Sequence, residues 1–274
     1  MQFGSEGCDI PKLKDYIAEA LDEGAFFLGM GDFHDVLSPS NRQRLKSAAL
    51  YDNASNWLER KMEEDIRYLY EDVLKPTKDR WLGMLEGHHF WEFTDGTTTD
   101  TRLCSLLDAP FLGTCGFMRL TFVKENESCT RGLSTSCDIW AHHGSRGGGS
   151  VGTILRQLDA ISGSFVADLY FMGHANRLEA SPKALLELGG SNGNIYLKNR
   201  DRYLVATGAF DKGYMVGSKD GMTGRPRGGY VEQGAMRPTT MGAASVTITP
   251  QVKCITAAGQ PRINHTELKI RVTL

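Results

Sequence analysis

The chain has 274 residues and is nearly neutral, with 31 Lys and Arg against 33 Asp and Glu and a formal net charge of −2. This length allows one large domain with a substantial core and leaves little room for two. The net charge gives no indication of a polyanionic partner such as nucleic acid, although a local basic patch is compatible with it. We therefore expect a single domain over residues 1–274.

The cysteine spacing and the hydropathy bear on disulfide bonds, membrane spans and the cellular compartment. The six cysteines are scattered without a CxxC pair or a regular spacing, which argues against a zinc ribbon and a disulfide framework. The N-terminus has no basic segment followed by an apolar run, and no stretch approaches the ~20 apolar residues of a membrane span. We expect reduced thiols, no membrane partner and a cytoplasmic location.

The first third of the sequence predicts helices around one short buried strand. Residues 1–8 are glycine-rich and loop-like, and apolar residues at helical spacing begin after Asp9, the expected N-cap. Residues 25–30 form an apolar run that stops at Gly31 and Asp32, which indicates a buried strand. Residues 40–74 carry a charged helical pattern that predicts two consecutive helices, closed by Pro76.

Three more apolar runs of strand length follow, and each ends at glycine and histidine. The runs cover residues 81–85, 138–141 and 168–172, and the residues at their ends are Gly87, His88 and His89, then His142, His143 and Gly144, then Gly173 and His174. In layered α/β folds ligands bind at this edge of the strands. Imidazole suits Mn, Fe and Zn, a carboxylate can bridge two cations, and glycine allows sharp turns. The set predicts a metal site.

The rest of the chain predicts a helix and a strand-rich tail. The helix is expected over residues 151–161, after a glycine-rich loop in which Arg146 is a candidate phosphate contact. Further strands are expected at residues 195–197, 203–206, 245–248 and 268–272, so that 210–274 forms a β-rich C-terminal part.

The order of these residues resembles that of the calcineurin-like metallophosphoesterases, whose motifs run Asp-x-His, Gly-Asp, Gly-Asn-His, His and Gly-His-x-His. The corresponding segments are Gly31-Asp32 for the second motif, Gly87-His88-His89 for the third with His in place of Asn, His142-His143-Gly144 for the fourth, and Gly173-His174-Ala175-Asn176 for the fifth with Asn in place of the last His. The resemblance covers residues 1–210. The segments LSPSNRQ, LKPTKDRWLGMLEGHHF, DGTTTD, LLDAPFLGT, HHGS and LVATGAF look like a bacteriophage or prophage branch.

The resemblance implies an α/β fold, a sandwich of two mixed β-sheets flanked by helices, with the metal site in loops on one edge. It implies that Asp32 bridges two cations about 3.5–4 Å apart, and that His88, His143 and His174 complete the shell of the second. His142 competes with His143 for that role, with His143 favoured. His89 would protonate the leaving alkoxide or stabilise the phosphoryl oxygens.

Two departures from the family pattern concern the first cation. Asn176 stands where the family has a histidine, and a carboxamide oxygen is a weaker ligand that suits harder cations. Met1 and Gln2 would occupy the last two positions of the first motif, so the Asp of that motif, and the strand that carries it, would lie before Met1. We expect a first metal site weakened at Gln2 and Asn176, and an N-terminal strand missing from the sheet.

The expected activity is metal-dependent hydrolysis of a phosphate ester, preferentially a phosphodiester in a nucleotide or nucleic acid, by a metal-activated hydroxide. The expected cofactor is one or two divalent ions, Mn²⁺ or else Fe or Zn. Two alternatives stay open, a catalytically degraded phage relative that acts as a binding or structural protein and a mononuclear phosphomonoesterase. A phage-encoded enzyme would act in the host cytoplasm.

Overall fold

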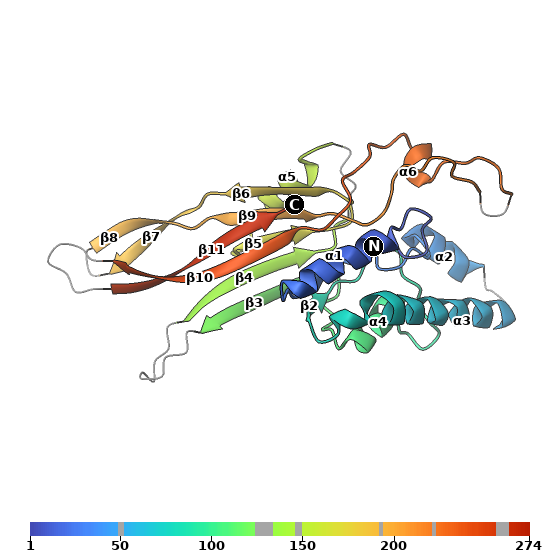
Figure 1. Cartoon of the computed structure of the whole chain (residues 1–274), viewed down its shortest axis with the longest axis horizontal. Coiled ribbons are helices and arrows are strands. Elements are labelled where there is room, and N and C mark those ends of the chain that lie inside the picture. The colour runs from blue at the N-terminus through green and yellow to red at the C-terminus, as the bar shows by residue number, and fades with distance from the viewer. Residues whose placement is uncertain (49–51, 124–133, 146–149, 192–193, 221–222, 256–262) are drawn as a thin grey trace.

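The computed structural model describes residues 1–48, 52–123, 134–145, 150–191, 194–220, 223–255 and 263–274, and shows a mixed α/β protein with several sheets and helices (Figure 1). The helices are α1 (Ile10–Asp22), α2 (Pro39–Ser47), α3 (Asp52–Leu69), α4 (Thr99–Leu107), α5 (Thr153–Ile161) and α6 (Tyr230–Gln233), with a π-helical turn over Tyr70–Leu74 and a 3₁₀ turn over Lys75–Thr77. The strands are β1 (Phe27–Gly29), β2 (Trp81–Met84), β3 (Cys115–Val123), β4 (Ser134–His142), β5 (Leu169–Met172), β6 (Leu178–Lys183), β7 (Leu186–Ser191), β8 (Asn194–Asn199), β9 (Arg202–Thr207), β10 (Ser245–Ile255) and β11 (Ile263–Thr273).

The largest sheet has five strands in the order β3-β4-β5-β9-β6. Strands β4, β5 and β9 run parallel, and β3 and β6 close the two edges as antiparallel strands. The register pairs His142 of β4 with Met172 of β5, so these strands end at the same level. The segments that follow them, which begin at His143 and Gly173, therefore leave the sheet side by side.

Both faces of this sheet are covered by other elements. Alternate residues of its central strands point to opposite faces, so each strand packs on both sides. Trp140 and Tyr170 pack on one side against Ile154 of α5. Ile139 and Leu169 pack on the other side against β1, β10 and β11. Burial on both faces explains why these strands read as continuous apolar runs in the sequence.

The second face carries two separate two-stranded sheets, β1-β2 and β10-β11. Strands β1 and β2 are parallel, and β10 and β11 form a long antiparallel hairpin whose Val246, Ile248 and Leu268 pack on the five-stranded sheet. Strands β7 and β8 form a further antiparallel hairpin. In Figure 1 the β7-β8 and β10-β11 hairpins reach the same end of the molecule.

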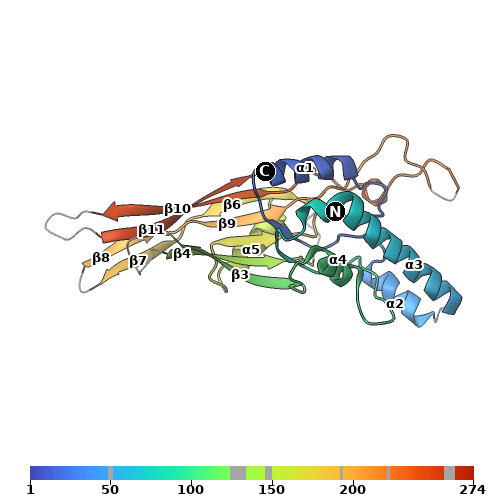
Figure 2. The same ribbon diagram turned by 60° about the horizontal axis from the view of Figure 1, so that its bottom comes forward.

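Helices α1, α3 and α4 pack on the β1-β2 pair. Leu13 of α1, Leu69 of α3 and Leu103 of α4 share one buried cluster with Met84 of β2. Figure 2 shows α2, α3 and α4 gathered at the end of the molecule opposite to the hairpins. No described helix has the length and apolarity that crossing a membrane requires.

The structure confirms most of the expected elements and corrects their bounds. The charged pattern over residues 40–74 forms two helices, as expected, and the strands expected after residue 80 are present. The first strand is shorter than predicted and covers only Phe27–Gly29, whereas β4 is longer and includes His142. Strands of the 210–274 region are confined, among described residues, to β10 and β11. The sequence analysis missed α4, β3, β6 and β7, and Arg146 lies outside the described residues.

Candidate metal centre

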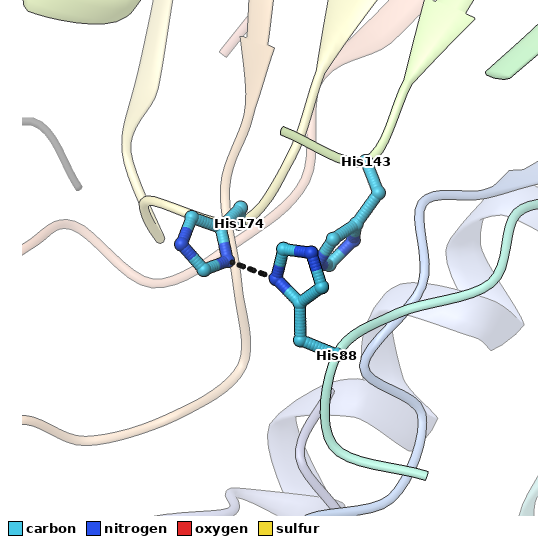
Figure 3. Close-up of side chains that lie close together, drawn as sticks. All are labelled: His88, His143 and His174. Atoms are coloured by element: carbon cyan, nitrogen blue, oxygen red, sulfur yellow. Dashed lines mark hydrogen bonds between the residues drawn. The ribbon is translucent and has the colours of Figure 1, made fainter. Parts of the chain in front are cut away.

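Three histidines from separate strand ends meet at one point. His88 follows β2, His143 follows β4 and His174 follows β5, and one ring nitrogen of each lies within 4.8 Å of the others. Figure 3 shows the three rings turned toward one another, with Nδ1 of His88 3.3 Å from Nδ1 of His174. This group could hold a metal ion.

His143 has its hydrogen-bonding roles fixed by its surroundings. The side chain is 1% exposed, and its Nδ1 lies 2.6 Å from the carbonyl oxygen of Met30. A carbonyl only accepts, so Nδ1 carries a proton, and Nε2 is the ring nitrogen that faces Asp32. That Nε2 has no hydrogen-bond partner among the described residues and lies 3.4 Å from Oδ2 of Asp32. Nε2 and Oδ2 are therefore a buried, close pair with no hydrogen bond between them, an arrangement that a bound cation would satisfy.

Asp32 is held in place by the turn that follows β2. Its Oδ1 accepts hydrogen bonds from the backbone N–H groups of His88 at 2.6 Å and His89 at 3.2 Å. Burial alone would raise the pKa of Asp32, but the contact with His143 and the N–H donors outweigh burial and hold the pKa well below its usual range. The carboxylate is therefore ionised and leaves Oδ2 directed at the histidines.

Two glycines make this close approach possible. A Cβ on Gly87 would lie 2.0 Å from the backbone nitrogen of Asp32, and a Cβ on Gly31 would lie 2.5 Å from Nδ1 of His143. Gly31 also has a φ of +85°, a left-handed conformation that favours glycine. Glycine at positions 31 and 87 thus lets the turn that carries Asp32 touch the turn that carries His88.

The remaining histidines of the cluster are neutral, as metal ligands must be. Burial, helped by the neighbouring His143 and His174, lowers the pKa of His88 to about 4. Burial also lowers the pKa of His174, with His143 as the next cause. Both rings therefore offer lone pairs at neutral pH without prior loss of a proton.

Backbone strain is concentrated around this point. Seven non-glycine residues among those described have positive φ, and four of them are predicted site residues: Gln2 at 57°, Asp32 at 50°, His174 at 64° and Asn176 at 52°. Such conformations are uncommon outside glycine and collect at functional sites, where the surrounding structure enforces them. The unusual backbone conformations therefore fall on the same residues that the side-chain pattern identified as candidate site residues.

His89 points to a different partner from its neighbour His88. Its Nδ1 lies 2.7 Å from Oδ1 of Asp35, and this hydrogen bond raises the pKa of His89. Arg42 braces the same turn by donating to the carbonyl oxygens of His88 and Phe90. His89 is thus a partly exposed imidazole beside the cluster whose protonated form is favoured by Asp35.

The structure separates His142 from the other candidate ligands. Because His142 ends β4, its side chain points to the face opposite to His143, where it stacks on Trp140 at a ring-centroid distance of 5.7 Å. Its Nδ1 accepts a hydrogen bond from the backbone N–H of Gly144 at 2.7 Å. The candidate that lies with His88 and His174 is therefore His143.

The two candidates for a further cation, Gln2 and Asn176, are placed by different observations. The backbone N–H of Gln2 donates to the carbonyl oxygen of Asp32 at 2.7 Å. Asn176 lines the same cavity as Asp32, His143 and His174. The three histidines supply nitrogen donors for one cation, and the described residues show no second such group of His, Cys, Asp or Glu around Gln2 or Asn176.

Sequence reasoning missed three features of the site. The carbonyl of Met30 that orients His143 is invisible in a side-chain pattern. Asp100 at the start of α4 is 1% exposed and accepts the N–H of Gly87 at 3.1 Å, and the Thr98 cap before it was the available signal. His34, 2% exposed, has no hydrogen-bond partner for either ring nitrogen among the described residues.

The comparisons with known proteins add no relative. No family model, no curated protein and no solved structure matches the chain. The centre is therefore described by its own geometry: three imidazoles converge from the ends of three strands, and the carboxylate of Asp32, from the turn after β1, lies against one of them, His143.

Proposed function

We propose that the chain is a metal-dependent phosphoesterase of the calcineurin-like type and that His88, His143, His174 and Asp32 hold its cation. The observation that carries the proposal is the contact of 3.4 Å between Nε2 of buried His143 and Oδ2 of Asp32, in which Nε2 makes no hydrogen bond to any described residue. The order of the donors along the chain, and their places after successive strands, supports the same family assignment.

The donor set fits a divalent transition metal. Neutral imidazoles suit Mn, Fe and Zn, and a carboxylate adds the negative charge that offsets part of the charge of the ion. The carbonyl of Met30 supplies the outer partner that metal-bound histidines use to fix their orientation. A bound dication would neutralise phosphoryl oxygens and lower the pKa of a water molecule, so the protein need not supply a nucleophile.

The residues of the chain then divide into two roles. Asp32 and the three histidines bind the ion, because each is buried or half-buried, and backbone contacts hold the side chains of Asp32 and His143 in place. His89 lies one residue away, and the bond of its Nδ1 to Asp35 raises the pKa of the ring, so its Nε2 is the atom that would donate a proton to a leaving alkoxide oxygen. An acid is useful when the leaving group is a sugar hydroxyl, which favours a phosphodiester in a nucleotide or nucleic acid as substrate.

Metal content and substrate preference test the proposal together. The chain, freed of metal and reloaded with Mn²⁺, is expected to bind at least one equivalent and to hydrolyse bis-p-nitrophenyl phosphate. Metal bound with no turnover of either a diester or a monoester would leave a binding protein with a degraded site. One equivalent with a preference for p-nitrophenyl phosphate would instead support a mononuclear phosphomonoesterase. Absence of any bound metal would overturn the proposal.

A further inference from the structure

A long loop connects β9 to β10 and carries α6. The structure describes residues 212–220 and 223–240 of it, and we call these residues the 212–240 loop. The two ends of the loop meet, because the backbone N–H of Gly242 donates to the carbonyl oxygen of Ala209 at 2.9 Å. In Figure 1 the loop lies toward the end of the molecule opposite to the tips of the β7-β8 and β10-β11 hairpins.

Hydrogen bonds within the loop hold its shape. The carboxylate of Glu232 accepts from the backbone N–H groups of Met215 at 3.2 Å and Gly229 at 2.6 Å, and from the hydroxyl of Ser218 at 3.2 Å. The backbone N–H of Arg227 donates to the carbonyl oxygen of Ser218 at 3.0 Å, which joins the two described segments. The loop therefore has a defined conformation and presents a defined set of side chains.

Positive charge is concentrated in this loop, although the chain as a whole is slightly acidic. Residues 212 to 240 include five basic and two acidic residues, whereas the net charge of the chain is −2. Both acidic side chains make contacts inside the loop, Glu232 as described above and Asp220 with Nη1 of Arg227 at 2.7 Å. Lys212 pairs with Asp9 at 2.8 Å. The other basic side chains are exposed, and they are Lys219, Arg225 and Arg237.

The loop starts at the edge of the sheet that carries the candidate metal centre. The register pairs Met172 of β5 with His142 of β4 and with Ala206 of β9, so the three strands end at the same level. The chain after β9 therefore leaves the sheet next to the segment after β5, which carries His174. A long anionic molecule bound by the loop would meet the same edge of the sheet as the centre.

Tyr214 presents an aromatic ring from the same loop. Its hydroxyl donates to the carbonyl oxygen of Met236 at 2.6 Å, yet the residue is 47% exposed. The bond holds the ring in place and leaves much of it open to solvent, and Arg237 follows Met236 directly in the chain. Proteins that bind single strands combine basic side chains with such rings, because an unpaired base can stack on the ring. A duplex, an anionic membrane or an acidic peptide offers no free base to it.

We propose that the 212–240 loop binds single-stranded nucleic acid, with Lys219, Arg225 and Arg237 on phosphates and Tyr214 against a base. The proposal rests on the proposed function and sharpens it, because it identifies the phosphodiester substrate as a polynucleotide. A free nucleotide carries too few phosphates to meet several cations of an exposed loop. Each phosphate that a cation neutralises releases counterions, so the affinity should fall as the salt concentration rises.

The probe is a fluorescein-labelled oligothymidylate of about 20 nucleotides, which is longer than a single binding site of this kind requires. Fluorescence anisotropy measures its binding to the full chain in EDTA. Because neither metal nor turnover enters this measurement, a failure of the proposed function would leave the result intact. The salt concentration is about 0.1 M, at which charges more than about 10 Å apart are largely screened.

Charge reversal tests the phosphate contacts. The double substitution Lys219→Glu, Arg225→Glu is expected to weaken binding by about tenfold or more and to lower the salt slope by about 1. The matched control is Lys269→Glu, Arg271→Glu, which makes the same change of charge on exposed residues of β11. Screening should limit the effect of this control to about twofold.

Tyr214→Leu tests the stacking contact and is expected to weaken binding by about fivefold or more. Tyr196→Leu is the control, because Tyr196 is also 47% exposed and belongs to β8, in a hairpin at the other end of the molecule. A DNA duplex of the same length and phosphatidylglycerol vesicles should bind more weakly than the single strand.

Several outcomes would overturn the proposal. They are absence of oligothymidylate binding, unchanged affinity in either loop variant, equal losses in a loop variant and its control, and binding of the duplex or the vesicles as tight as that of the single strand.

Discussion

The two halves of the candidate metal centre are built differently. His143 and His174 follow β4 and β5, strands that are hydrogen-bonded on both sides within the five-stranded sheet. Asp32 and His88 follow β1 and β2, a pair that forms a sheet of only two strands. The first half is positioned by a sheet, whereas the second is positioned by turns.

The second half is held by contacts that cross between turns and helices. Gly87 lets the turn after β2 reach Asp32, Asp100 of α4 accepts the N–H of Gly87, and Arg42 of α2 binds the carbonyl of His88. The site thus lies where the turns after β1 and β2 meet the ends of β4 and β5. We call this contact the seam, and a few identifiable atoms hold it together. Substitutions in the half positioned by the sheet and in the half positioned by turns should therefore have different effects on metal binding, turnover and stability.

The largest effect is expected for His143→Ala, on the sheet side of the seam. The substitution removes the buried imidazole that faces Asp32 and leaves the carbonyl of Met30 without its donor. Affinity for Mn²⁺ should fall by more than the ~10–100-fold that loss of an outer-sphere partner costs. Competition with a chelator dye measures it. His142→Ala is the matched control, since its ring lies on the opposite face, and an equal loss there would contradict the assignment.

The adjacent pair His88 and His89 tests the turn side of the seam. His88→Ala should lose metal, whereas His89→Ala should keep metal and lose about 10²–10⁴ in turnover, because an acid acts on the transition state without anchoring the ion. Metal binding and diester hydrolysis measured on both variants decide this. If both lose metal equally, the roles of the two histidines have been assigned wrongly.

Gly87→Ala should loosen the seam without removing a ligand. The new Cβ would lie 2.0 Å from the backbone nitrogen of Asp32, so the two turns must move apart, at a cost of about 1–3 kcal/mol in the free energy of unfolding. Urea unfolding measures that cost. Gly163→Ala is the control, because a Cβ there would meet no atom closer than the carbonyl oxygen of Ala160, at 3.4 Å. Similar behaviour of the two variants would show that the approach of the turns is not tight.

A pH-dependent effect is expected for Asp100→Asn. Burial raises the pKa of Asp100 to about 7, so the folded state keeps a proton that the unfolded state loses above a pKa of 3.8. Its contribution to stability is present in full below pH 3.8 and is lost as pH rises toward 7. The amide keeps an acceptor for Gly87 and does not titrate, so the variant should equal the parent at low pH and exceed it in stability near pH 7. Urea midpoints across this range check it, and a constant difference would contradict the cause.

The sequence predicted those parts of the molecule that depend on local pattern. Asp32, His88, His143 and His174 were found because each follows an apolar run, and apolar runs are what buried parallel strands require.

What escaped prediction depends on partners that are distant in sequence. Strand β6 contains a proline and a lysine and β7 contains two glycines, so neither shows the alternation of a strand, and both exist because β9 and β8 pair with them. Likewise, the choice between His142 and His143 required the position at which β4 ends. No local pattern supplies that position.

The most direct test of the central claim is the location of a bound cation. Crystals grown with MnCl₂ and measured at the manganese absorption edge should show an anomalous peak within ~2.0–2.2 Å of Nε2 of His143, with Oδ2 of Asp32 as a further ligand. A peak elsewhere, or a direct hydrogen bond between Asp32 and His143 with no cation between them at saturating metal, would contradict the account.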